Sequence, residues 1–116
     1  MDNKIIEIIT LLRNKTLSNK ADWQKLDEEA FYIDFAGSRI IINNYENSFQ
    51  DMDDSPRMLI YNRRNEVIYT ITDGDNPNIS ELFYLARDNY YNISETFDQM
   101  LDQLRDPDLT IGDLPF

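Results

Sequence analysis

Apolar residues near the start of the chain recur every three to four positions, which is typical of an amphipathic helix. We therefore predict a first helix from about residue 3 to residue 14, followed by a turn at 14–19. Trp23 comes next, and we expect its large ring to seal this helix against the rest of the core. The residues that form the predicted stripe are Ile5, Ile8, Ile9 and Leu12.

Beyond Trp23 the spacing changes to an alternation of apolar and polar residues. Phe31, Ile33 and Phe35 alternate with polar neighbours, which predicts a strand with one side turned inward. The segment 39–45 is rich in β-branched residues and follows the short connection "AGSR". These two segments predict a β-hairpin that turns at residues 37–38.

A second hairpin is predicted after the polar loop that Pro56 closes. Its strands are the segments 57–63 and 66–73, which contain "MLIY" and "VIYTIT". The turn between them includes Arg64 and Asn65, and asparagine tolerates a positive φ.

The apolar spacing then returns to that of a helix. Asn78, with Glu81 three residues later, resembles a capping box that opens a second helix. Asn92 is expected to stop this helix in a left-handed conformation, and Ser94 is expected to cap a third helix. The expected core residues of the second helix are Ile79, Leu82, Phe83, Ala86 and Tyr90; those of the third are Phe97, Met100, Leu101 and Leu104.

These elements predict an α+β fold: an N-terminal helix, an antiparallel four-stranded meander and two C-terminal helices packed on one face of the sheet. We expect one domain from residue 1 to residue 105 and an irregular C-terminal tail at 106–116. Which face of the sheet is exposed stays open, because apolar residues alternate onto both faces. The residues that leave the choice open are Tyr32, Ile41, Leu59, Tyr61, Ile68 and Thr70.

Charge narrows the range of partners. The 22 acidic and 11 basic residues give a net charge of -11, which repels nucleic-acid phosphates and anionic lipids. The longest purely aliphatic run is Ile40 to Ile42, far short of the ~20 residues of a membrane helix, and the N-terminal residues do not resemble a signal peptide. We expect a cytoplasmic protein that binds neither nucleic acid nor membrane. The acidic surface either resists association or docks a basic protein partner.

The sequence offers little for catalysis. It contains neither cysteine nor histidine, so cysteine nucleophiles, the usual general base and the usual metal ligand are missing. Asp51, Asp53 and Ser55 match the first ligands of a calcium-binding EF-hand loop, but Pro56 replaces the required glycine and Asn62 the bidentate glutamate. We predict that the protein is not an enzyme and has no cofactor and no dedicated metal site.

The second helix contains more aromatic residues than its core face needs. Tyr84, Arg87 and Tyr91 are spaced i, i+3 and i+7, so they lie on a neighbouring side with the arginine between two rings. Tyrosine and arginine are common at binding hot spots, and guanidinium groups stack on aromatic faces. The alternative is that the tyrosines cover the edge of the core while Arg87 pairs with an acidic neighbour.

Three segments resemble a recurrent type of small, uncharacterised bacterial α+β protein: "IIEIITLLRNKTLSNKADW", "YNRRNEVIYTI" and "ELFYLARDNYYNISETFDQML". The resemblance implies a fold, but no activity, cofactor or functional residue. The sequence departs from this type at 89–92, where Asn-Tyr-Tyr-Asn replaces the expected small residue and glycine.

Two hypotheses about function follow. The first is a small regulatory or interaction protein, of the inhibitor or immunity kind, whose acidic face binds a basic partner. The second is a module that senses a small molecule or peptide through Tyr84, Arg87 and Tyr91. A homodimer through a strand edge or this stripe stays open. The candidate interaction residues are Tyr84, Arg87, Tyr91, Asp51, Asp53 and Asp54.

Overall fold

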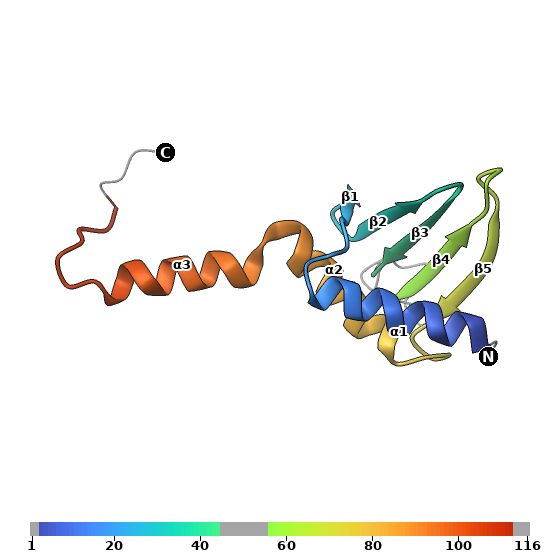
Figure 1. Cartoon of the computed structure of the whole chain (residues 1–116), viewed down its shortest axis with the longest axis horizontal. Helices are drawn as coiled ribbons and strands as arrows, with labels where there is room; N and C mark the ends of the chain where they lie inside the picture. The colour runs from blue at the N-terminus through green and yellow to red at the C-terminus, as the bar shows by residue number, and fades with distance from the viewer. Residues whose placement is uncertain (1–2, 45–55, 113–116) are drawn as a thin grey trace.

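The structure is a computed structural model that describes residues 3–44 and 56–112 (Figure 1). One antiparallel sheet holds five strands in chain order, so each strand pairs with its neighbours in sequence. The elements are α1 (Asn3–Leu17), β1 (Gln24–Asp27), β2 (Ala30–Phe35), β3 (Ser38–Asn43), β4 (Arg57–Tyr61), β5 (Val67–Thr72), α2 (Asn78–Tyr91) and α3 (Ile93–Arg105).

The predicted α+β class, the two hairpins and the order of the elements are confirmed, but the predicted number of strands is wrong. The additional strand is β1, which has only four residues, Gln-Lys-Leu-Asp, and pairs with β2 through three of them. This segment has one apolar residue, Leu26, and that residue is exposed at the place where the register shifts. Alternating hydrophobicity therefore could not reveal β1.

Two predicted turn residues have the expected backbone conformation. Gly37 has φ 82° in the first hairpin, and Asn65 has φ 64° in the second. In the second hairpin, the Asn62 Oδ1 atom accepts hydrogen bonds from the amides of Arg64 (2.9 Å) and Glu66 (3.1 Å). An asparagine at the start of the turn therefore helps to fix it.

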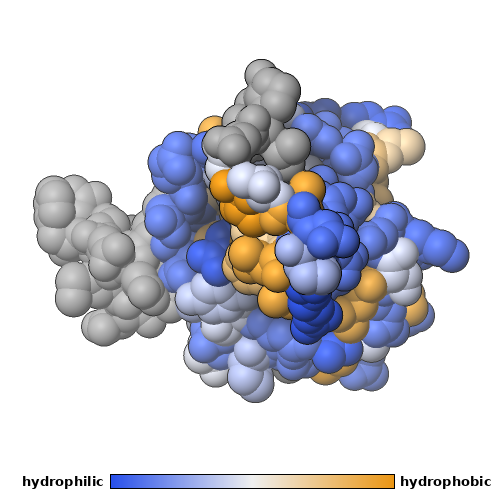
Figure 2. Space-filling view, turned by 90° about the vertical axis from the view of Figure 1, so that its left-hand side faces the viewer, coloured by the Kyte–Doolittle hydropathy of each residue, from blue (hydrophilic) through white to orange (hydrophobic). Residues whose placement is uncertain are grey.

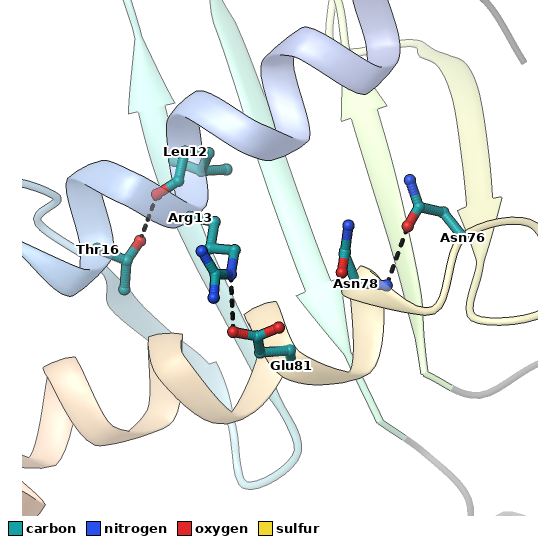
Figure 3. A network of polar contacts seen from close by, with 6 residues as sticks. All are labelled: Leu12, Arg13, Thr16, Asn76, Asn78 and Glu81. Atoms are coloured by element: carbon teal, nitrogen blue, oxygen red, sulfur yellow. Dashed lines mark hydrogen bonds and ion pairs between the residues drawn. The ribbon is translucent and has the colours of Figure 1, made fainter.

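The core lies between one face of the sheet and the helices α1 and α2. Trp23 is 1% exposed, which confirms the core prediction. Its Nε1 donates to Thr16 Oγ1 at 3.0 Å. Thr16 Oγ1 in turn donates to the Leu12 carbonyl at 2.8 Å (Figure 3). α1 continues to Leu17, beyond its predicted end at residue 14, and Thr16 is buried in its last turn. The main buried residues are Ile9, Leu12, Phe31, Ile40, Ile42, Met58, Ile71, Ile79, Leu82, Phe83 and Ala86.

The register identifies the face of the sheet opposite α1 and α2. Because side chains alternate along a strand, the neighbours of buried Ile40, Ile42 and Met58 point the other way. On that face the Arg39 guanidinium stacks on the Tyr32 ring and its Nε lies 2.6 Å from Asp34 Oδ1. The row across the face is Tyr32, Ile41, Leu59 and Thr70.

The predicted capping box at the start of α2 is wrong. Asn78 is already helical, and its backbone amide donates a hydrogen bond to Asn76 Oδ1 at 2.9 Å (Figure 3). The Ser80 amide donates a hydrogen bond to Asp73 Oδ1 at 3.0 Å. Glu81 instead forms an ion pair with Arg13 at 2.7 Å, so it links α2 to α1. Residues before the helix therefore supply the cap.

The prediction that both C-terminal helices pack on the sheet is wrong for α3. Figure 1 shows α3 extending away from the sheet and from α1 and α2. The Cα radius of gyration is 17.4 Å, whereas a compact chain of this length has about 13 Å. None of the α3 residues is buried. The described tail residues 106–112 contain neither helix nor strand, and the division at residue 105 stays a prediction.

Candidate protein-interaction site

The structure separates the predicted tyrosine and arginine stripe into two groups. The Arg87 guanidinium lies 5.0 Å from the centre of the Tyr84 ring. The Tyr91 ring instead lies 6.1 Å from the Phe31 ring, and Lys25 Nζ is 5.8 Å from its centre. Tyr91 therefore turns toward β1 and β2, while Arg87 stacks on Tyr84.

Tyr90 and Tyr91 together cover the edge of the core. Tyr90 was expected inside, but it is 38% exposed, with its ring centre 5.7 Å from Phe31. The two tyrosine rings meet edge to face at 5.0 Å. A hydrogen bond to Glu28, and to a smaller extent one to Tyr91, raises the pKa of the Lys25 amine above its usual 10.5, because both favour the charged form. This arrangement is typical of a core edge with wet hydroxyls.

The remaining predicted site residues cannot be placed. Asp51, Asp53 and Asp54 lie outside the described residues, as does Ser55 of the same motif.

Among the residues that are described, no group of three or more His, Cys, Asp or Glu side chains could hold a metal ion. No described helix is both long and apolar enough to cross a membrane.

A row of exposed apolar side chains lies on α3, where the sequence predicted a core stripe. Its four large side chains recur at i, i+3, i+4 and i+7, so they share one side of the helix. All of them are exposed to solvent: Phe97 by 59%, Met100 by 54%, Leu101 by 43% and Leu104 by 66%. We name these four residues the α3 stripe.

The polar residues of α3 lie on the sides of the helix away from the stripe. At about 100° per residue, Asp98 and Arg105 lie beside the stripe on one flank, and Thr96 and Gln103 lie on the other. Glu95, Gln99 and Asp102 lie on the side opposite to the stripe, where Gln99 Nε2 donates to Glu95 Oε1 at 3.5 Å. Arg105 in the last turn suits the negative end of the helix dipole. α3 therefore combines an apolar face with a polar face that carries three carboxylates.

Figure 2 views the molecule from the side toward which α3 extends. Hydrophobic surface gathers near the centre of this view, and hydrophilic surface surrounds much of it (Figure 2). An apolar centre with a polar rim is the usual anatomy of a protein interface.

A short, well-bonded junction sets the direction of α3. Asn92 has φ 53° and ψ 43°, which confirms the predicted left-handed stop. The predicted cap at Ser94 is wrong, because Ser94 lies within α3 and its amide and Oγ both donate to the Asp88 carboxylate at 2.9 Å. The Thr96 amide donates to the Asn92 carbonyl at 2.9 Å. Two anchored residues thus hold the first turn of α3 at an angle to α2.

Comparisons with known proteins give no relative. No family model matches the chain, no curated protein is similar to it, and no solved structure matches it. The function must therefore be argued from the described surfaces.

Proposed function

We propose that the protein is a small acidic interaction protein that inserts the α3 stripe into an apolar groove on a protein partner with a basic rim. The observation that carries this proposal is that four large apolar side chains on one face of a projecting amphipathic helix are exposed by 43 to 66%. Amphipathic helices commonly bind partners in this helix-in-groove mode.

Burial of the α3 stripe would supply binding energy that the free protein lacks. Fully burying a Leu, Met or Phe side chain contributes about 1.5 to 3 kcal/mol relative to full exposure. Because each of the four side chains is roughly half exposed, a groove would gain about 1 kcal/mol from each, before the costs of association.

The marginal stability of an isolated helix also supports docking of α3 in a groove. α3 has 13 residues, and an isolated helix of that length is only marginally stable in water. Its contacts with the body lie at its first turn, where Asp88 holds Ser94. A groove that covers the apolar face would stabilise the remaining turns.

Charge selects the kind of partner. The net charge of -11, together with Asp98 beside the stripe and Glu95 and Asp102 elsewhere on α3, would attract a basic rim and repel an acidic one. A small protein that covers a basic functional surface would act as a regulator, of the inhibitor or immunity kind. The alternative sensing role for Tyr84, Arg87 and Tyr91 has weaker geometric support, because Arg87 stacks on Tyr84 while Tyr91 contacts Phe31.

A quantitative pull-down from the cell of origin tests the proposal. The parent is compared with Phe97→Ala/Leu104→Ala and with a matched control, Ile8→Ala/Leu11→Ala, which removes two exposed apolar side chains from α1. We expect a basic protein that the parent and the control retain, that the α3 variant loses, and that dissociates as salt rises from about 0.05 M to about 0.5 M. Equal retention by all three proteins would contradict the proposal.

A further inference from the structure

Strand β5 is an edge strand of the described sheet. Among the described strands it pairs only with β4, and its residues Val-Ile-Tyr-Thr-Ile-Thr carry no charge. Val67 is 47% exposed, Ile68 59% and Tyr69 37%. The opposite edge, β1, is four residues long, contains Lys25 and Asp27 and has a register shift, all of which discourage pairing. The β5 edge has only the irregularity near Ile68.

Backbone groups on the open side of β5 are available for pairing at its centre. The Asp73 amide donates to the Pro56 carbonyl at 3.0 Å, so it points toward β4. Backbone direction alternates along a strand, so the amides of Thr72 and Thr70 point to the open side. The Thr72 amide is already bonded to Asp75 Oδ2 at 3.1 Å. The groups around Thr70 are therefore the ones that a new strand would meet.

The charges at the two ends of β5 make the edge complementary to itself. Arg63 and Arg64 lie in the turn before the strand, where Glu66 offsets one of them, and Asp73 and Asp75 follow the strand. In an antiparallel pair related by a two-fold axis, the arginine end of one copy lies beside the aspartate end of the other. Each carboxylate has a second oxygen besides the one bonded within its own chain.

We propose that β5 pairs antiparallel with β5 of a second copy of this chain and joins the two sheets into one. The pairing is centred at Tyr69, which places the two Tyr69 side chains opposite each other and uses the open backbone groups around Thr70 in place of the occupied Thr72 amide. Figure 1 shows β5 at the end of the molecule opposite to α3, so the dimer presents two free α3 stripes. The dimer is independent of the proposed partner binding.

Sedimentation at increasing protein concentration tests the dimer, at about 0.15 M salt, where charges more than ~8 Å apart are largely screened. We expect the parent and the control Met100→Lys/Leu104→Lys to form dimers, and Ile68→Lys/Thr70→Lys to stay monomeric. Both variants add the same charge at exposed positions. A parent that stays monomeric throughout, or dimers that only the α3 control loses, would overturn the proposal.

A cross-linking experiment keeps the test valid if the lysine variant does not fold. Because the chain contains no cysteine, a disulfide in a single-cysteine variant must join two copies. We expect Tyr69→Cys to oxidise to a covalent dimer at least about ten times faster than Leu26→Cys on the exposed edge strand β1, since only the first brings its two thiols together. Equal rates would overturn the pairing. A pull-down that fails with an intact dimer would contradict only the proposed function.

Discussion

Replacing one leucine in α2 and one in α3 by alanine should produce very different losses of stability. The chemical change is the same in Leu82→Ala and Leu104→Ala, but Leu82 is fully buried and Leu104 is 66% exposed. Alanine has the higher helix propensity, so neither change weakens its helix directly. The comparison therefore isolates what each side chain packs against.

The expected magnitudes follow from these environments. Leu82 packs in the core between α1, α2 and the sheet, and a buried Leu→Ala change costs about 3 to 5 kcal/mol through lost burial and cavity formation. Leu104 has solvent on most of its surface, so its truncation should change the free energy of unfolding by no more than about 0.5 kcal/mol. Small domains have only about 5 to 15 kcal/mol of stability, which makes the first loss large.

Urea unfolding followed by far-UV circular dichroism measures both changes. With a slope of about 2 kcal/mol per molar, typical of a small domain, Leu82→Ala should lower the midpoint by about 2 M and Leu104→Ala by no more than about 0.25 M. A loss of about 2 kcal/mol or more in Leu104→Ala would refute the reasoning, because the α3 stripe would then pack within the protein. A small loss in Leu82→Ala would refute the assignment of the core.

Two further predictions concern single buried or strained positions. Thr16→Val leaves the buried Trp23 Nε1 without its acceptor and should lower the free energy of unfolding, measured in urea, by about 1 to 3 kcal/mol. Thr16→Ser keeps the acceptor and should lower it by less. Equal losses in the two variants would contradict the role of the hydroxyl. Asn92→Ala places a residue with a Cβ but no polar side chain at φ 53°, and it should lower the free energy of unfolding by about 1 kcal/mol. Asn92→Gly should be nearly neutral, because glycine tolerates a positive φ. If Asn92→Ala had the higher melting temperature of the two, the left-handed junction would be contradicted.

Much of the fold could be predicted because local patterns and tertiary packing agree. The alternating residues Phe31 and Ile33 do face the core, although Phe35 at the end of the strand is 47% exposed, and Gly37 and Asn65 occupy turns with positive φ. Strand β1 was missed because it has one apolar residue and is extended through its pairing with β2. Its existence depends on a neighbour that local patterns do not identify.

The surfaces were harder to predict than the elements. Helical spacing correctly identified an apolar face on α3, but spacing does not show whether that face meets the protein's own sheet or solvent. Similarly, Tyr84, Arg87 and Tyr91 share a side of α2, but the Tyr91 ring lies against Phe31 and near Lys25. Contacts with distant strands decide where such side chains point, and those contacts become visible only in the fold.

The measurement that tests the central claim most directly is the amount of basic partner retained by Phe97→Ala/Leu104→Ala relative to Ile8→Ala/Leu11→Ala, both checked for folding by circular dichroism. The α3 stripe predicts that the first variant loses most of the partner at about 0.15 M salt while the second retains as much as the parent. Equal retention by both variants would contradict the assignment of α3 as the docking element.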